Sequence, residues 1–376
     1  MTTILQASGG ADLLSLVPLL TGFRPQRSLV LLPFTGPRTC GALRLDLPPG
    51  PDALETTGDG AAGIDAFAAT AIGMACRIPD VDAVAIIVYA EEEPMLGGVL
   101  PRADLVEQLS RRASMCGLRI VEALCSGNEE WADYRSPDDP PLPLSALPSA
   151  PRVPGVGAVD PDQRSGAVLP VVERGEKRAV RDAVRALDRS PGLRTVLFSP
   201  PPLDPARLTE ALGIDGAVPF FERALVDASA LSTAESAALI WMLDRPLLRD
   251  VALVQWARDE STGAAALTAQ LEFDGDRSVF PTDIGEVILG RGPRPDGGRL
   301  RAALAIVRNA AAQAPRSHRG GALAAAAWLS WALGRSTHAG RYLDQAEAIG
   351  RVPPFGDLLR TLINAAVLPD WAFVRP

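Results

Sequence analysis

Acidic, tyrosine and arginine side chains lie at the ends of predicted strands in the first third of the chain. Asp46 closes the run LRLD, and Tyr89 and Glu91 lie at and just beyond the end of the run VDAVAIIVY. Ligands usually bind outside the carboxyl ends of strands in α/β sheets, and hard divalent cations prefer carboxylate oxygens. If the two strands are neighbours, Asp46 and Glu91 could hold a divalent cation. Arg24 and Arg27 lie at the turn that enters the first strand, and the five residues form a candidate ligand or metal site.

A structural interpretation of the same residues stays open. Glu91 begins a run of three glutamates, and runs of like charge usually lie on solvated surfaces. In that case Arg24 or Arg27 would be an ion-pair partner. The sequence therefore predicts either a site at the sheet edge or an ordinary acidic loop there.

The residue types on which most enzymes depend are scarce. Lysine occurs once, at Lys177, and no G-x-x-x-x-G-K-S/T motif is present, which excludes a P-loop phosphate site. Histidine occurs only at His318 and His338, and neither an H-E-x-x-H zinc motif nor a G-x-S-x-G nucleophile turn is present. We interpret both histidines as turn or helix-surface residues. No catalytic set is recognised, so an enzymatic activity is uncertain and less expected than a binding role.

The cysteine spacings match neither a disulfide framework nor a zinc site. The four residues are Cys40, Cys76, Cys116 and Cys125. Because no C-x-x-C pair occurs among them, we expect reduced and mostly buried thiols.

Charge and hydropathy restrict the classes of partner. The formal net charge is -8, so the summed field of the protein repels nucleic-acid phosphates and anionic lipid heads. The N-terminus lacks a basic signal-peptide flank, and the apolar stretch 322–333 is shorter than the roughly 20 residues of a membrane span. We expect a cytoplasmic protein that binds neither nucleic acid nor membrane. The only cofactor that the sequence suggests is a divalent cation.

Two kinds of apolar pattern alternate through residues 1–134. Continuous runs typical of buried strands alternate with helical patterns, which is the order of an α/β fold. The run 81–89 is the most apolar, so it should lie centrally in a mixed or parallel sheet. Ser8 is expected to cap the first helix and Gly22 to end it. We expect strands over 28–32, 40–47, 81–89 and 118–124, and helices over 11–20, 61–76 and 100–112.

Prolines crowd residues 135–161, which predicts an extended linker. Beyond it the patterns are mainly helical. The chain should therefore consist of an α/β domain over 1–134, this linker and a helical domain over 162–376. We expect helices over 173–187, 205–212, 233–243, 247–258, 300–312, 323–333, 337–349 and 355–366.

The last helices resemble one unit of a helical repeat. Gly334 separates two of them, and small residues on both would let the pair approach closely, as in tetratricopeptide-type hairpins. A single hairpin of this kind is more often a packing device than a peptide groove. Trp371 and Phe373 follow in a tail that could bind a protein partner or pack inside the chain itself.

Two parts of the sequence resemble one protein family. The stretch ADLLSLVPLLTGFRPQRSLVLL, followed by LRLDLP, is similar to the opening of an actinobacterial family of unknown function, the domain of unknown function 4192. RDVALVQWA and the ending AAAAWLSWALGRSTHAGRYLDQAEAI resemble its second half. The resemblance agrees with the fold expected above and brings no activity, cofactor or catalytic residue. Between 125 and 143 many members carry a longer segment with cysteines, of which only Trp131 and Tyr134 remain here, so any role of those cysteines is in doubt for this chain.

Two hypotheses follow. The leading one is a non-enzymatic binding or scaffold protein that uses its C-terminal helices for a protein partner. The alternative is a metal-assisted enzyme or small-ligand binder at the carboxyl ends of the N-terminal strands. No heptad or apolar patch in the sequence assigns an oligomeric state.

Overall fold

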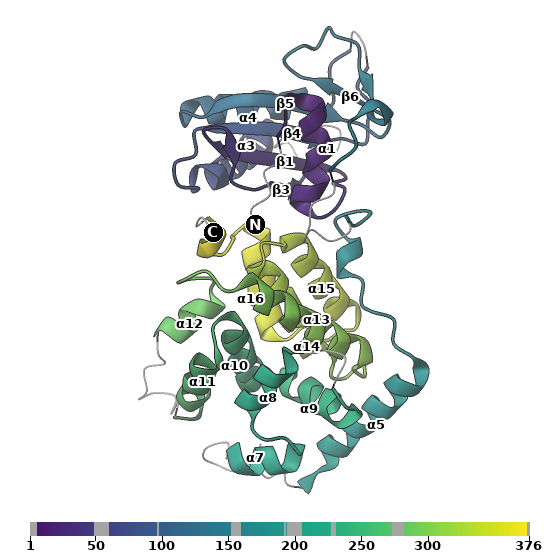
Figure 1. Cartoon of the computed structure of the whole chain (residues 1–376), viewed down its shortest axis with the longest axis vertical. Helices are drawn as coiled ribbons and strands as arrows, with labels where there is room; N and C mark the ends of the chain where they lie inside the picture. Colours follow the sequence, from purple (N-terminus) through teal and green to yellow (C-terminus); the bar gives the residue numbers. More distant parts are fainter. Residues whose placement is uncertain are drawn as a thin grey trace. The chain divides into compact units, whose positions relative to one another are not determined.

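The chain folds into two compact units. The computed structural model describes residues 6–48, 60–95, 98–151, 159–191, 193, 205–226, 231–272 and 282–373. The first unit comprises Met1–Gly166 with Phe373–Pro376, and the second comprises Ala167–Ala372. The first is an α/β unit with a mixed sheet, and the second is mainly helical (Figure 1).

One mixed sheet organises the first unit. Its order is β2-β1-β4-β5-β6-β7, and β3 pairs with β1 beside β2. The β4–β5 pair is parallel and the other pairs are antiparallel. The most apolar run of the sequence, in β4, lies between β1 and β5, as its composition predicts. The strands are β1 (Ser28–Thr35), β2 (Arg38–Thr39), β3 (Leu43–Asp46), β4 (Ala83–Tyr89), β5 (Arg119–Ser126), β6 (Glu130–Asp133) and β7 (Leu142–Pro143).

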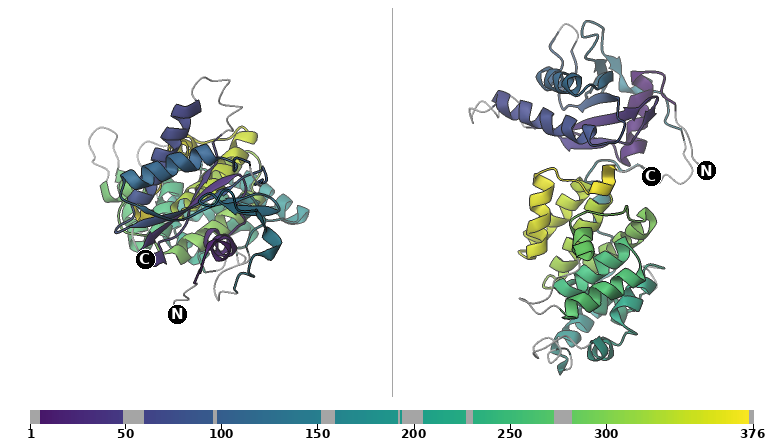
Figure 2. Two further views of the ribbon diagram at one scale, coloured as in Figure 1. Left: turned by 90° about the horizontal axis from the view of Figure 1, so that it is seen from above. Right: turned by 90° about the vertical axis from the view of Figure 1, so that its left-hand side faces the viewer.

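Helices cover both faces of this sheet, with α1 (Gly10–Thr21) on one face and α3 (Gly60–Cys76) and α4 (Ala103–Met115) on the other (Figure 2). Val30 of β1 packs with Leu14 and Val17 of α1. Its neighbours Leu29 and Leu31 point the other way, into the cluster under α3 and α4. Because strand side chains alternate between faces, a strand covered on both faces must be apolar throughout, which explains the run SLVLL.

The ends of α1 differ in how far the sequence predicts them. Gly22 ends the helix in the left-handed conformation at φ 80°, and its N–H donates to the Pro18 carbonyl. The predicted cap at Ser8 is wrong, because the N-cap is Gly9 and has no side-chain bond. The backbone N–H of Ser8 donates instead to the Asp12 carboxylate at 2.8 Å.

The proline-rich segment is partly structured. Leu142 and Pro143 form β7, which pairs with β6 at the sheet edge. Pro143 is tolerated there because an edge strand has one side that needs no backbone donor. Further along, Asp160 bridges Phe23, and the Gln163 side chain bonds both backbone groups of Gln26. These contacts assign residues up to Gly166 to the first unit.

The second unit has one hydrophobic core centred on α14, whose residues 320–332 are all buried. The neighbouring helices α13, α15, α9, α10 and α16 pack around it. None of the described helices is both long and apolar enough to cross a membrane. The helices are α5 (Arg174–Arg189), α7 (Pro205–Leu212), α8 (Ala217–Ala224), α9 (Thr233–Leu243), α10 (Pro246–Ala257), α11 (Glu260–Glu272), α12 (Thr282–Ile288), α13 (Gly297–Gln313), α14 (Arg319–Ala332), α15 (Ser336–Ala348) and α16 (Pro354–Asn364).

Candidate functional site

The register of the first sheet places one residue from each of five strands in a single row. Asp46 and Tyr89 both pair with Ser28, Tyr89 also pairs with Ser126, and Ser126 pairs with Trp131. Paired residues point to the same face, which here is the α1 face. Asp46 and Tyr89 thus both lie at the carboxyl ends of their strands, on the same side of the sheet, as expected. The strands β3 and β4 are not neighbours, however, because β1 lies between them.

Asp46 is engaged by an arginine that the sequence analysis did not single out. The Arg44 guanidinium lies 2.5 Å from the Asp46 carboxylate and donates to the Ser28 hydroxyl at 2.8 Å. The Arg44 side chain is only 7% exposed, whereas the Asp46 side chain is largely in solvent. Ser28 in turn donates to the Gln26 carbonyl. The Asp46 carboxylate therefore neutralises a buried cation.

Glu91 pairs with Arg27, whose Nε lies 3.4 Å from the carboxylate, and both side chains are mostly exposed. Arg27 has φ 46°, a left-handed conformation that is uncommon for residues other than glycine, and its carbonyl accepts the N–H of Leu47. Arg24 is exposed, and its backbone N–H donates to the Asp160 carbonyl. The pair of Arg27 with Glu91 is the arrangement expected if these residues form an ordinary acidic loop with an arginine as its ion-pair partner.

Tyr89 is the residue of this row whose buried polar group lacks a hydrogen-bond partner among the described residues. Its hydroxyl is shut from solvent, although the residue as a whole is half-buried. Burial raises the pKa of this hydroxyl above its usual range. A buried hydroxyl without a partner costs free energy, so this position is a candidate for ligand contact.

Another glutamate of the acidic run has a structural role. Glu93 accepts the backbone N–H groups of Asn128, Glu129 and Glu130 at 2.7, 3.1 and 3.2 Å. It thereby fixes the turn between β5 and β6. A Cβ on Gly127 would lie 2.2 Å from the Glu93 carboxylate, so this close approach requires glycine. Within the described parts of the chain, no group of three or more histidine, cysteine, aspartate or glutamate side chains lies together as metal ligands would.

The tail aromatics lie inside the fold. Trp371 is 2% exposed, and its indole N–H donates to the Ala332 carbonyl at 3.0 Å. Phe373 is also buried, and the Arg77 guanidinium lies 4.0 Å from its ring centroid. Phe373 and Arg77 belong to the first unit. Neither aromatic side chain offers an exposed surface in this conformation.

The first unit has a cavity of about 240 Å³ between α1 and the outer strands. Arg135 lines it, bonds Glu122 and bonds Asp133 at 2.7 Å. Burial raises the pKa of Glu122 against the opposing effect of Arg135. One guanidinium thus pairs with two carboxylates in a cavity that the Trp131 ring also lines.

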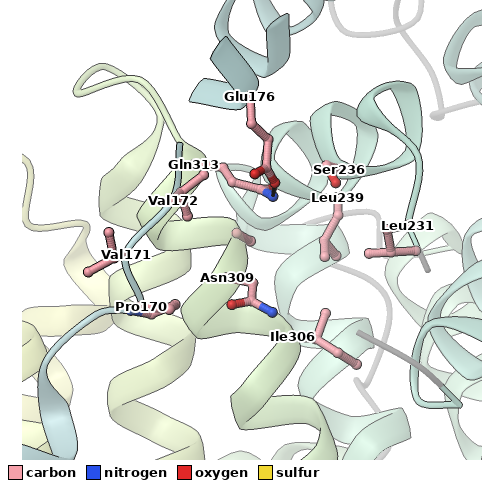
Figure 3. A pocket seen from close by; sticks show the side chains of 11 residues that line it. Pro170, Val171, Val172, Glu176, Leu231, Ser236, Leu239, Ile306, Asn309 and Gln313 are labelled. Carbon is pink, nitrogen blue, oxygen red and sulfur yellow. Dashed lines mark hydrogen bonds between the residues drawn. The ribbon is translucent and has the colours of Figure 1, made fainter. Parts of the chain in front are cut away.

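The second unit contains a groove of about 210 Å³, shown in Figure 3. The extended residues before α5 form one wall, and α9 and α13 form the others. Most of its lining residues are aliphatic, but the surface that it presents is mainly polar, because two amides, one hydroxyl and one carboxylate face it. Lining residues are Pro170, Val171, Val172, Glu176, Leu231, Ser236, Leu239, Ile306, Asn309, Ala310 and Gln313.

Two amides lie one turn apart in this groove. Asn309 and Gln313 occupy positions i and i+4 of α13, so they share one helix face. Gln313 donates to the Glu176 carboxylate at 2.6 Å, whereas none of the described residues bonds the Asn309 side chain. Beside them Val171 is fully exposed and lies at the wall of the groove, where a ligand could cover it. The groove therefore combines an apolar wall with amide donors and acceptors.

One of the two histidines departs from the role predicted for it, because His338 is buried within α15. His318 lies in the turn before α14, as predicted. Its Nδ1 contacts Ser317 Oγ at 3.0 Å and its Nε2 contacts the acceptor Asp188 Oδ1 at 3.2 Å, a serine–histidine–aspartate contact that the sequence did not predict. The adjacent start of α14 is closed, because a Cβ on Gly320 would lie 2.2 Å from the Arg351 carbonyl oxygen. A substrate carbonyl therefore has no room beside the backbone N–H groups in the first turn of α14, and we assign no hydrolytic role to His318 and its partners.

Comparison with known proteins yields one family. A family model described as a domain of unknown function (DUF4192) matches residues 11–272. The match covers the whole sheet of the first unit and the second unit as far as α11. No curated protein and no solved structure matches the chain.

Proposed function

We propose that this chain, which belongs to the DUF4192 family, is a non-enzymatic binding protein whose helical unit receives an extended segment of a protein partner. The observation that carries the proposal is the groove in which Asn309 and Gln313 lie one turn apart beside the exposed Val171. A cytoplasmic location is part of the same proposal.

The groove has the chemistry of a peptide site. A side-chain amide both donates and accepts, so it matches the alternating N–H and C=O groups of an extended main chain. Asn309 is ready for such a bond, and Gln313 can exchange its bond to Glu176 for one to a partner. Burial of a valine-sized side chain against the apolar wall contributes about 1.5–3 kcal/mol. The affinity would then come from apolar contact and the orientation from the amides.

The C-terminal hairpin supports a scaffold of this kind. Gly334, at φ 76°, makes the turn between α14 and α15. The small residues expected to bring the two helices together are all buried between them or against their neighbours, namely Ala325, Ala326, Ala339 and Ala346. A tetratricopeptide-like character of this pair remains our proposal. It would provide a rigid support for α13, which packs on α14.

Selection from a phage-displayed library of random peptides on the immobilised full-length protein tests the groove. Peptides that are enriched should bind the parent in solution and bind Val171→Asp and Asn309→Ala at least about tenfold more weakly, a change of 1.4 kcal/mol. Val226→Asp is the matched control, because Val226 is also largely exposed in the same unit but does not line the groove. Equal binding by the parent and both groove variants would refute the proposal.

A second candidate rests on the unpartnered Tyr89 hydroxyl in the row at the sheet edge. There the first unit would bind a small ligand or a divalent cation through Asp46 and Glu91. Magnesium or manganese chloride should then raise the Tm of the parent and leave that of Asp46→Asn unchanged, since ligands that bind only the folded state stabilise it. An unchanged Tm of the parent with both metals would remove the cation from this candidate.

A further inference from the structure

Two cysteines occupy equivalent places in the first unit. Cys76 is the last residue of α3, and Cys116 is the residue that directly follows α4. Both are exposed, as is Cys40, and only Cys125 is buried. The expectation of mostly buried thiols is therefore wrong, because two helix ends and the end of the edge strand β2 bring three of the four to the surface.

The topology brings the ends of α3 and α4 together. Each helix leads directly into a strand, α3 into β4 and α4 into β5, and these strands are parallel neighbours that pair from Ala83 and Arg119 onward. Both helices pack on the same face of the sheet and against each other. They consequently run in the same direction and end side by side, and Figure 1 shows them adjacent over the sheet.

The two thiols lie at neighbouring helix ends. Burial, and then the side chain of Cys116, raises the pKa of Cys76 to about 11. One turn before Cys116, Arg112 pairs with Asp65 of α3 and so ties the two helices together. Asp65, and after it Cys116, raise the pKa of the Arg112 guanidinium.

We propose that Cys76 and Cys116 form a thiol–disulfide exchange site whose co-reactant is a low-molecular-weight disulfide. The Cys116 thiolate attacks one sulfur of the small disulfide, the bond between its two sulfurs breaks, and one small thiol leaves with a proton from water. Cys76 then loses its proton to solvent and attacks the Cys116 sulfur, which expels the second small thiol. Two protein thiols are oxidised by two electrons, and one small disulfide is reduced to two thiols.

The other cysteines provide internal controls. Cys40 is exposed but lies at the opposite side of β1, where its sulfur contacts the Thr35 hydroxyl at 3.2 Å. It can form a mixed disulfide but has no second thiol to resolve it. Cys125 is fully buried in β5, where a small disulfide cannot reach its sulfur, so it should stay reduced while the unit is folded.

Incubation of the full chain with oxidised glutathione, followed by N-ethylmaleimide and non-reducing digestion, tests the site by mass spectrometry. We expect a cross-linked peptide that joins Cys76 to Cys116, a glutathione adduct on Cys40 and unmodified thiol on Cys125 before unfolding. Dithiothreitol should reverse both oxidations. The oxidised protein should also melt at a higher temperature than the reduced one, because the new bond closes a loop within one unit.

Single substitutions separate the two steps. In Cys76→Ser, Cys116 should retain one glutathione, because the resolving thiol is gone. In the parent, the same adduct should be found only transiently. A parent protein that keeps a stable adduct on Cys116 while Cys76 reacts with N-ethylmaleimide overturns the proposal, as does pairing of Cys76 with Cys40. The near-ultraviolet circular dichroism of Cys76→Ser, compared with that of the parent, shows whether the fold is intact.

Discussion

The two units differ in how the polar groups at the ends of their secondary structure are satisfied. Arginine–carboxylate pairs occur in both units, such as the exposed pair of Arg27 with Glu91 at the sheet in the first and the pair of Arg299 with Glu222 in the second. In the second unit, four of the five tryptophan indoles also donate to backbone carbonyls at or near the carboxyl ends of helices. These bonds are Trp256 to Phe221, Trp328 to Ile288, Trp331 to Val367 and Trp371 to Ala332.

The contrast follows from secondary structure. A sheet pairs its own carbonyl groups, so side chains at its edge are left for solvent or ligands. A helix leaves its last four carbonyls without an internal partner, and a buried helix end must find donors elsewhere. An indole supplies one N–H together with a large apolar surface, so it can fill a core and cap a helix end at the same time. Substitutions at buried indoles should therefore cost far more than substitutions in the exposed pairs.

The largest effect is expected at Trp371. Trp371→Ala should lower the free energy of unfolding by about 3–5 kcal/mol, because it leaves a cavity and an unbonded Ala332 carbonyl. Trp371→Phe keeps most of the volume and should cost about 1–3 kcal/mol. Urea unfolding followed by circular dichroism measures both. Leu358→Ala, at an exposed position of α16, is the control, and equal stabilities of Trp371→Ala and the control would contradict the buried position.

A matched pair of glycines tests how tightly α14 is packed. A Cβ on Gly321 would lie 2.2 Å from the Leu243 carbonyl oxygen, whereas a Cβ on Gly340 of α15 would meet nothing within 4 Å. Gly321→Ala should therefore destabilise the second unit by about 1–3 kcal/mol. Gly340→Ala should stabilise it by about 0.5–1 kcal/mol, since alanine favours helix. Thermal melting of the two variants should thus shift in opposite directions, and a shared direction would argue against the close packing.

A smaller effect is expected at the start of α11. Hydrogen bonds from the Ser261 hydroxyl and the Thr262 backbone lower the pKa of Asp259 to about 2. A carboxyl group whose pKa is lowered by folding stabilises the folded state above its unfolded pKa, near 3.9, and this contribution is lost as the pH falls toward 2. Asp259→Ala should cost about 0.5–2 kcal/mol at pH 7, as for other helix caps.

Unfolding curves at pH 7 and pH 3 check the sign of this effect. The difference between the parent and Asp259→Ala should shrink at pH 3, because the parent loses part of the contribution of the carboxylate there. A difference that grows on acidification would contradict it.

The smallest effect is expected at the exposed pair of the sheet edge. Glu91→Gln should change the free energy of unfolding by less than about 1 kcal/mol, since exposed ion pairs contribute little and salt screens them. The same measurement in 1 M sodium chloride should remove what difference remains. A loss of several kcal/mol would show that Glu91 contributes more than this exposed pair, and the contrast between the units would then be weaker.

Local patterns in the sequence predict most elements but not their association. The run VDAVAIIVY indicates a buried central strand, and the helical pattern over 233–243 has the observed bounds of α9. The proline-rich segment is predicted as an extended linker, yet Pro143 lies in an edge strand, which tolerates the missing N–H. The helix α8, which has Pro219 in its first turn, is not predicted.

The sites depend on contacts that no local pattern contains. Asp46 and Glu91 are visible in sequence, but the insertion of β1 between their strands and the contact of Arg44 with Asp46 depend on strand order. The groove gathers residues from Pro170 to Gln313 that only the packing of α5, α9 and α13 brings together. The spacing of Asn309 and Gln313 is a signal in the sequence, but the helix predicted over 300–312 ends one residue before Gln313, and the structure extends α13 to include it.

The buried position of α14 also determines how the second unit must open. Residues 320–332 contact neighbouring helices on every side, so none of their amides can reach solvent while those neighbours stay in place. Their hydrogens should exchange with deuterated water only when the whole unit unfolds, whereas the amphipathic α5, whose polar face lies in solvent, can exchange through local fraying. The slowest-exchanging amides of α14 would thus report the global stability of the helical unit from within a single segment.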